Sequence, residues 1–484
     1  VTQTLRHLTM PVIMTSVTTA IAFYAISMTE IIQLKHFGIF VSIGTLVAML
    51  FSLFFIPALL MVLPEKKSLK KTETGSEFET VYAKTLINLT RVFIKYPVIT
   101  ATVAGVVFIV SLFGASRVVV DNNNAKYFLK NSNIYISSEK LNTDAAGSAV
   151  INLLIHTDST ENEPFKNPEN LKYVDHLAEF VKSQAVVGKV LGLTELIKRI
   201  NFVLNDEAEE FNKVPITSDA GEDVKHLISQ LLLLYENGGG DTLTDFTDNG
   251  YTRLNIPIVL QTNSSQDIYQ LSKQVNAFVS KNFPDHIMVD ISGSASVSVA
   301  ATDEIVTGQM KSLILSLGVV LLMLFFTFRK VSYAAIAMVP LMMTIAINFG
   351  IMGFFSIPLD IGTAIISSIV IGIGVDYSIH YLSRLKKNLD QGMQFKGALN
   401  NTISHSGKAI VSNAITVGLG FVALLYSILT PLIIMGWMIT VTMIVSALST
   451  LVLIPVFIIF VEKRATFGSK DTKPQRLAFN PQQG

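Results

Sequence analysis

The chain has 484 residues, of which 50% are hydrophobic and only 15% are charged, whereas soluble domains average about a quarter charged residues. The net charge of +1 leaves no basic surplus to neutralise phosphates, so nothing points to a nucleic-acid partner. The absence of cysteine excludes disulfide scaffolds, thiolate zinc sites and cysteine nucleophiles. This composition is typical of an integral membrane protein.

Apolar stretches long enough to cross a bilayer recur along the chain. About 20 helical residues at 1.5 Å each span the roughly 30 Å hydrocarbon core. No small-residue cleavage site follows the first stretch, so it does not resemble a signal peptide. We predict eight transmembrane helices, at 9–28, 37–63, 97–116, 312–328, 333–355, 359–381, 409–428 and 432–461.

Lysine and arginine are concentrated in alternate connections between these spans. Connections 64–96 and 382–408 are rich in lysine and each contains one arginine, whereas 356–358 and 427–431 have neither residue. The positive-inside rule therefore predicts that both termini are cytoplasmic and that the long insert 117–311 is external. In a bacterium this describes a multi-pass protein of the inner membrane with a periplasmic domain.

The insert 117–311 is long enough to form a hydrophobic core of its own. Its strand-like and helical runs alternate in two strand–helix–strand groups, which predicts an α+β, ferredoxin-like module. A receptor-like ectodomain without a role in transport remains an alternative. The predicted strands are 149–156, 186–191, 253–261 and 287–291, and the predicted helices are 167–184 and 266–283.

An internal repeat relates the two ends of the chain. When the sequence is shifted by 398 residues, segment 4–61 lies on 402–459 without a gap. The last two predicted helices therefore duplicate the first two, and parallel repeats are common in transporters. Helices equivalent to the fourth to sixth spans are accordingly expected before Val1. The coinciding pairs include Thr4/Thr402, His7/His405, Thr18/Thr416, Phe23/Phe421, Gly38/Gly436, Ile56/Ile454 and Pro57/Pro455.

Asp376 is the one carboxylate placed clearly inside a predicted span. An aspartate at mid-helix costs about 2.5–3.5 kcal/mol on insertion scales, so it is a functional candidate, here for proton transfer. His380 lies one turn later on the same helical face, and Tyr377 can hydrogen-bond to a neighbouring helix. Alternatively, Asp376 is a structural hydrogen-bonding group and His380 and Tyr377 are interfacial residues. Asp376 and His380 alone are too few ligands for a metal site.

The seventh predicted span carries hydroxyl and amide side chains at helical spacing, namely Ser412, Asn413 and Thr416. They are candidate hydrogen-bond partners for a buried carboxylate on an adjacent helix, with generic helix packing as the alternative. Glycines in the sixth and seventh spans are expected to allow close helix packing; these are Gly372, Gly374, Gly418 and Gly420.

The segment GIGVDYSIHYLSR (372–384) resembles the signature of the central helices in the resistance-nodulation-division (RND) superfamily of transporters. More narrowly, the chain resembles the MMPL-like lipid exporters, the hydrophobe/amphiphile efflux group and the Patched-like, sterol-sensing proteins. The order of elements is also similar: one helix, a large external porter domain, then five helices. The resemblance covers the last two-thirds or so of a twelve-helix transporter.

This resemblance implies proton-driven export, with Asp376 and Tyr377 as the second of two Asp-Tyr pairs. The first pair would lie upstream of Val1. The family would place Thr416, and its repeat mate Thr18, next to the proton relay. The multidrug branch has a lysine in its tenth helix, and its absence here favours the branch that handles lipids. The expected partners are a lipid or hydrophobic small molecule, protons and the membrane, with a homo-oligomer or accessory envelope proteins also possible; no cofactor is implied.

The predicted function is therefore that of a lipid exporter driven by the proton-motive force, and the alternative is a lipid-sensing receptor without net transport. An enzyme finds no support, because the histidines of the insert show no nucleophile–base pattern. The predicted organisation is 1–63, the last two helices of a first transmembrane half; 64–96, a cytoplasmic linker; 97–116, the first helix of the second half; 117–311, the porter domain; 312–461, the five remaining helices; and 462–484, a cytoplasmic tail.

Overall fold

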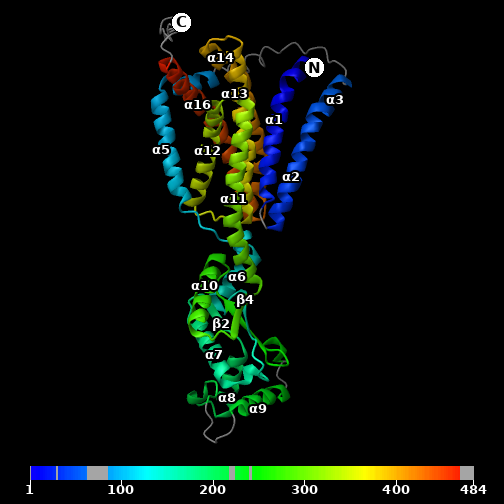
Figure 1. Ribbon diagram of the computed structural model, residues 1–484, viewed down its shortest axis with the longest axis vertical. Helices are drawn as coiled ribbons and strands as arrows, with labels where there is room; N and C mark the ends of the chain where they lie inside the picture. The colour runs from blue at the N-terminus through cyan, green and yellow to red at the C-terminus, as the bar shows by residue number, and fades with distance from the viewer. Residues whose placement is uncertain (1, 29–30, 63–84, 217–223, 239–242, 469–484) are drawn as a thin grey trace. The chain divides into compact units, whose positions relative to one another are not determined.

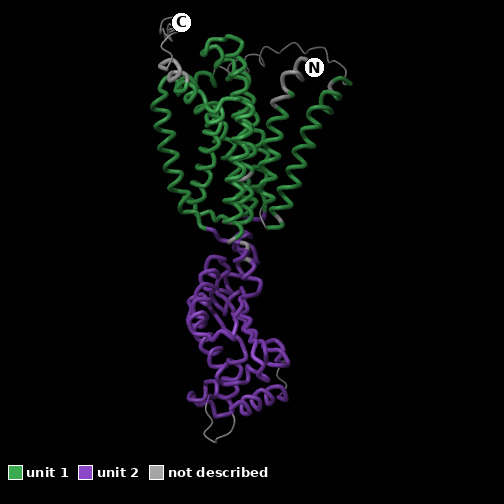
Figure 2. Tube along the Cα trace, viewed as in Figure 1, with its two compact units in different colours: residues 1–119, 304–427, 431–484 green, residues 120–303, 428–430 purple. Residues whose placement is uncertain are grey.

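Two units make up the computed structural model, a helical unit and an α/β unit (Figure 2). The structure describes residues 2–28, 31–62, 85–216, 224–238 and 243–468. The α/β unit consists of Val120–Asp303 with the short segment Ile428–Thr430, and the helical unit contains the remainder. Most of the predicted linker 64–96 and most of the predicted tail 462–484 lie outside the described residues.

Long apolar helices form the helical unit (Figure 1). Short π-helical turns join α2 to α3 and α14 to α15. Helix α11 begins in the α/β unit and continues into the helical unit. The helices are α1 (Thr2–Ile26), α2 (Ile32–Leu50), α3 (Ile56–Val62), α5 (Pro97–Ala115), α11 (Ser294–Phe328), α12 (Val331–Phe354), α13 (Ile361–Asp390), α14 (Phe395–Thr402), α15 (Lys408–Val422) and α16 (Thr430–Gly468).

Seven helices in the described residues are long and apolar enough to cross a membrane. They coincide with seven of the eight predicted spans, so the chain is a polytopic membrane protein. The remaining predicted span, 9–28, coincides with α1. The apolar part of α1 that the structure describes fully, Val12–Ile26, is shorter than the others, and this span stays a prediction.

Helix α13 begins at a capping box. The Asp360 carboxylate accepts a hydrogen bond from the Thr363 backbone N–H at 2.7 Å, and the Thr363 hydroxyl accepts one from the Asp360 N–H at 2.8 Å. The two side chains satisfy backbone donors that the first turn of a helix leaves unpaired. Asp360 is only 5% exposed at this helix start.

The two copies of the internal repeat make equivalent helix contacts. On α2, a Cβ at Gly38 would stand 2.6 Å from the Phe23 carbonyl oxygen of α1. On α16, a Cβ at Gly436 would stand 2.8 Å from the Phe421 carbonyl oxygen of α15. Gly38/Gly436 and Phe23/Phe421 are repeat mates, so both ends of the chain use the same glycine-mediated helix contact. The structure confirms the predicted repeat at these positions.

A four-stranded antiparallel sheet forms the centre of the α/β unit, in the order β2-β3-β1-β4. The chain order is β1-α7-β2 in the first half of the unit and β3-α10-β4 in the second, so one helix connects the two strands of each half. This is the split β-α-β arrangement that the sequence predicts. The strands are β1 (Ala149–Thr157), β2 (Val187–Val190), β3 (Arg253–Leu260) and β4 (Ile287–Ser292). The helices of this unit are α6 (Asn133–Asp144), α7 (Pro168–Lys182), α8 (Leu193–Leu204), α9 (Val224–Asn237) and α10 (Ser265–Asn282).

One face of this sheet is the core of the α/β unit. Ile151, Leu153 and Ile155 alternate along β1 and are fully buried, because successive side chains of a strand point to opposite faces. The apolar stripes of α7 and α10 belong to the same buried cluster, which includes Leu177 and Leu271. The helices α8 and α9 are inserted between β2 and β3.

Candidate functional site

Asp376 lies near the middle of α13 and is half-buried. The hydroxyl that reaches its carboxylate is that of Thr19 on α1, 3.4 Å from each carboxylate oxygen. The same hydroxyl lies 3.1 Å from the carbonyl oxygen of Gly372, one turn earlier on α13. One hydroxyl proton is thus shared among three acceptors, at distances near the long limit of a hydrogen bond. The hydrogen bonds from Thr19 to the carboxylate are therefore weak.

Helices α1 and α13 approach closely at this point because Gly372 has no side chain. A Cβ there would stand 3.3 Å from Thr19 Cγ2 and 3.5 Å from the Phe23 ring. A larger residue at position 372 would move α1, and with it the Thr19 hydroxyl, away from Asp376. Gly372 thus sets the distance between the carboxylate and its hydroxyl partner.

The other three glycines differ in their surroundings. A Cβ at Gly374 would stand 3.1 Å from Leu341 Cδ1 of α12, and one at Gly418 would stand 3.4 Å from Thr440 Cγ2 of α16. Both lie where two helices meet. A Cβ at Gly420 would find no described atom within 4 Å, because this side of α15 is exposed. The structure gives Gly420 no packing contact among the described residues.

Tyr377 joins α13 to two further helices. Its hydroxyl accepts a hydrogen bond from Asn413 Nδ2 of α15 at 3.3 Å and lies 3.7 Å from Met443 Sδ of α16. Tyr377 is 2% exposed. Successive helical residues are about 100° apart, so α15 and α16 meet α13 on a different side from the one that carries Asp376.

Ser412 and Thr416 are therefore not the partners of the Asp376 carboxylate in this structure. Both are exposed side chains of α15, the helix that meets α13 at Tyr377. Of the three polar side chains predicted on this helix, Asn413 is the one that reaches α13. His380 is half-buried one turn after Asp376, and its backbone carbonyl oxygen lies 3.4 Å from the Ser406 hydroxyl.

Thr18 is buried, but its hydroxyl is directed to its own helix. It donates to the carbonyl oxygens of Met14, at 2.9 Å, and Thr15, at 2.7 Å. The next residue, Thr19, carries the hydroxyl that reaches Asp376. The repeat relates Thr18 to Thr416 but Thr19 to Val417, so a search for paired polar residues passes over Thr19.

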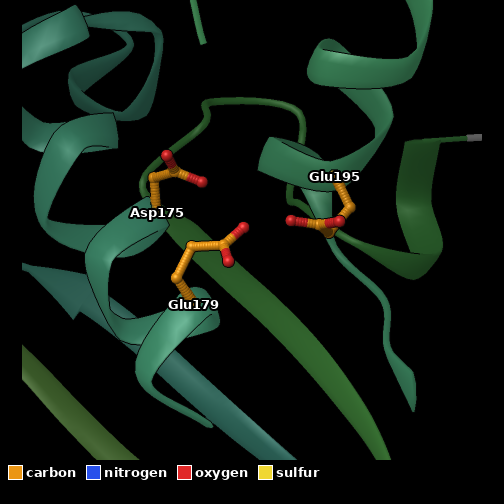
Figure 3. Close-up of side chains that lie close together, drawn as sticks. All are labelled: Asp175, Glu179 and Glu195. Atoms are coloured by element: carbon orange, nitrogen blue, oxygen red, sulfur yellow. The ribbon is translucent and has the colours of Figure 1, made fainter. Parts of the chain in front are cut away.

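A separate carboxylate cluster lies in the α/β unit (Figure 3). Carboxylate oxygens of Asp175 and Glu179 on α7 and of Glu195 on α8 lie within 4.8 Å of one another, as the ligands of a metal ion would. The Lys198 ammonium lies among them, at 2.5 Å, 2.8 Å and 3.1 Å respectively. Lys198 is thus the cation of this cluster, and the arrangement is an ion-pair network that joins α7 to α8.

The pKa values of this network reflect burial and pairing together. Burial alone would lower the pKa of Lys198, but hydrogen bonds to Asp175 and Glu179 outweigh it and raise the pKa above its ordinary value. Burial raises the pKa of Asp175 in spite of the lysine. The hydrogen bond from Lys198 lowers the pKa of Glu179, which is more exposed. Lys198 therefore stays charged at neutral pH.

The sequence profile of the MMPL family matches residues 1–88 and 130–479, which is most of the chain. The chain belongs to the MMPL family. This confirms the resemblance to the MMPL-like proteins that residues 372–384 carry.

Curated relatives of this MMPL chain match over shorter segments. The trehalose monomycolate exporter MmpL3 of Mycobacterium tuberculosis is 29% identical over 140 residues, which cover 28% of this chain and 15% of the exporter. A membrane protein of Methanocaldococcus jannaschii is 29% identical over 150 residues, which cover 31% of this chain and 38% of that protein. These matches span well under two-thirds of either relative.

A solved structure matches nearly the whole MMPL chain. The hedgehog release protein Disp from the water bear Hypsibius dujardini superimposes with a TM-score of 0.61 and 15% sequence identity. The match covers 95% of this chain and 59% of that protein. At this identity the likeness concerns the fold, and it supports a polytopic membrane protein.

Proposed function

We propose that the protein exports lipids or other hydrophobic or amphiphilic molecules and is driven by the proton-motive force. In this proposal, Asp376 takes up a proton and releases it in each transport cycle. The observation that carries it is the half-buried carboxylate in the middle of α13, whose described hydrogen-bond partner is the single hydroxyl of Thr19. Among the described residues, Asp376 takes part in no ion pair. A carboxylate without a cation inside a membrane is costly, and protonation removes that cost.

The link from proton to transport is the contact between α1 and α13. When Asp376 is charged, the Thr19 hydroxyl is drawn to the carboxylate; when Asp376 is neutral, the hydroxyl can bond to the Gly372 carbonyl oxygen alone. Protonation thus changes how tightly the two helices are held together. We infer that this change alters their packing and is passed on to the α/β unit, which we assign as the porter domain.

Membership of the MMPL family supports a lipid substrate. One of the matching relatives carries the name of a trehalose monomycolate exporter, which handles a glycolipid. Export of a hydrophobic molecule needs a source of free energy, and one charge that crosses 100 mV contributes about 2.3 kcal/mol. We further propose the bacterial inner membrane as the location, with both termini cytoplasmic and the α/β unit periplasmic.

The experiment that tests this function uses the complete protein in lipid vesicles. We expect a fluorescent lipid to move across the vesicle membrane when an inward-directed pH gradient is imposed, and this movement to stop when a protonophore collapses the gradient. Vesicles without protein are the control. Lipid movement that is equally fast with and without the gradient would contradict proton coupling. Binding of lipid without any movement would favour the lipid-sensing receptor instead.

A further inference from the structure

Ser265, the first residue of α10, is the centre of a buried group of hydrogen bonds in the α/β unit. Its backbone N–H donates to Asp121 Oδ1 at 2.9 Å. Its hydroxyl accepts hydrogen bonds from the Asn122 backbone N–H and from the Thr302 hydroxyl, each at 2.8 Å, and donates to Asp121 Oδ1 at 3.4 Å. All four residues are buried, and Ser265 is fully buried. We call this group the junction cluster; it consists of Asp121, Asn122, Ser265 and Thr302.

The junction cluster lies where the chain enters and leaves the α/β unit. The chain enters this unit after Val119 and leaves it through α11, after Asp303. Asp121 is the second residue of the unit, and Thr302 lies one residue before the exit. Ser265 therefore holds the entering segment, residues 119–122, and the leaving helix α11 to one point at the start of α10.

Within the helical unit, the first residue of the entering segment is bonded to the loop before α13. The Val119 carbonyl oxygen accepts a hydrogen bond from the Leu359 backbone N–H at 2.9 Å. Leu359 directly precedes Asp360, the N-cap of α13, and Asp376 lies on the same helix. Two residues of chain, about 7 Å when extended, separate Val119 from Asp121. A shift at the beginning of α13 thus has only a short length of chain to cross before it meets the junction cluster.

The short segment Ile428–Thr430 also belongs to the α/β unit and leads into α16. Leu429 in this segment forms an isolated antiparallel bridge with Phe128. The Tyr127 hydroxyl, next to Phe128 in the sequence, donates a hydrogen bond to Asn122 Oδ1 of the junction cluster. The connection to α16 is therefore linked to the junction cluster through residues 127 and 128.

Helix α10 joins the junction cluster to the core of the α/β unit. Ile268 and Val275, on the buried side of α10, belong to the same hydrophobic core as the strands of the sheet. At the start of the helix, the Ser265 hydroxyl uses its one donor and both of its acceptor positions. A side chain without a hydroxyl at this position would leave the donors of Asn122 and Thr302 without this acceptor, and both links to α10 would be weakened.

We propose that Ser265 is a positioning residue for transport. It holds the entering segment and α11 to the start of α10, so that movements of the membrane helices are passed on to the sheet as one movement. A purely structural role would stabilise the α/β unit without linking proton uptake to lipid movement. The inference rests on the proposed function, and the number of protons taken up per lipid moved separates these two roles.

The test measures lipid movement and proton uptake together, in vesicles that contain the complete protein under an imposed pH gradient. In Ser265→Ala we expect lipid movement to fall several-fold while proton uptake continues, so the number of protons per lipid should rise several-fold. Ser272→Ala is the matched control and should keep the wild-type ratio, because its hydroxyl on α10 is bonded to the Ile268 carbonyl oxygen of its own helix. A wild-type ratio in Ser265→Ala, whether both rates fall or neither does, would overturn the inference.

A milder variant keeps the test decisive if Ser265→Ala does not fold. Thr302→Val keeps the shape of the side chain and removes the bond from α11 to the Ser265 hydroxyl, while the bonds from Ser265 to the entering segment remain. We expect its number of protons per lipid to lie between those of wild type and Ser265→Ala. A wild-type ratio in Thr302→Val would overturn the inference by itself. Wild-type protein that moves no lipid under the gradient would instead contradict the proposed function.

Discussion

At the scale of single residues, the Thr19 hydroxyl is the described hydrogen-bond donor to the Asp376 carboxylate. Thr19→Val removes this donor and keeps the shape of the side chain. One hydrogen bond contributes about 1 kcal/mol, a factor of about five in a rate, so we expect proton-driven transport to slow by about that factor.

The neighbouring threonine provides the matched control. Thr18→Val removes a hydroxyl that bonds only to the backbone of its own helix, so transport should stay near the wild-type rate. The measurement is the initial rate of lipid movement in vesicles under a fixed pH gradient. Equal rates for Thr19→Val and Thr18→Val would contradict a special role for Thr19.

Lys198 pairs with all three carboxylates of the ion-pair network between α7 and α8. Removing one partner of a buried ion pair leaves uncompensated charge and costs about 3–5 kcal/mol. We expect about 2–3 kcal/mol for Lys198→Met, because water screens the half-exposed Glu179. Hydrogen exchange of the α7 and α8 amides measures this loss as a lower free energy of opening. Lys182→Met, at an exposed position of α7, should change the exchange far less, because Lys182 contributes only a minor attraction to Glu179.

The pH dependence of this exchange follows from the pKa shifts. The pKa of Lys198 lies above its ordinary value of 10.5, so its contribution to stability is complete below pH 10.5 and is lost at higher pH. The pKa of Glu179 lies below its ordinary value of 4.5, so its contribution is present above pH 4.5 and is lost as the pH falls further. Burial raises the pKa of Asp175, and this weakly opposes the loss in acid. Protection of α7 and α8 should therefore be greatest between these limits.

The residues of the candidate site were only partly predictable from the sequence. Asp376 stands out because a carboxylate in an apolar span is rare and costly. Thr19 does not, because a threonine in a helix gives no sign of the direction of its hydroxyl, and its repeat mate is Val417. Ser412 and Thr416 have the right spacing, but the helix that carries them meets α13 beside Tyr377.

At the scale of elements, the paired contacts at Gly38 and Gly436 predict matching mutational effects. A Cβ at either position would stand less than 3 Å from a carbonyl oxygen of the neighbouring helix, so Gly38→Ala and Gly436→Ala should force two helices apart and lower the melting temperature of the purified protein.

Two exposed glycines serve as controls. A Cβ at Gly44 on α2 or Gly420 on α15 would meet no described atom within 4 Å, so alanine there should be neutral or raise the melting temperature, since alanine favours a helix. Equal losses at all four positions would contradict close packing at Gly38 and Gly436 as the cause of the loss, because alanine by itself favours the helix.

Elements were more predictable than side-chain contacts. The strands and helices of the α/β unit follow the alternation of apolar residues, and β1 and β3 begin at the expected residues Ala149 and Arg253. The connection between α13 and α15 is not one continuous helix. Helix α13 continues to Asp390, the chain turns at Gly392 with φ of 81°, and α14 begins at Phe395. Leu385 on α13 and Leu399 on α14 are both buried.

At the scale of the whole molecule, the distribution of lysine and arginine predicts the orientation in the membrane. Single cysteines introduced at Lys387, at the end of α13, and at Lys189, in β2, test it without interference because the chain has none of its own. An impermeant thiol reagent added to intact spheroplasts should label Lys189→Cys and leave Lys387→Cys unlabelled. The opposite pattern would invert the proposed topology.

Two asparagine variants of α13 test most directly whether Asp376 couples transport to protons. Asp376→Asn keeps the shape of the side chain and removes the titrating group, while Asp390→Asn makes the same change at the exposed end of the same helix. In vesicles that contain the complete protein, transport driven by a pH gradient should be abolished by Asp376→Asn and retained by Asp390→Asn, at equal amounts of folded protein. Undiminished gradient-driven transport by Asp376→Asn would contradict the account and leave Asp376 as a structural hydrogen-bonding group.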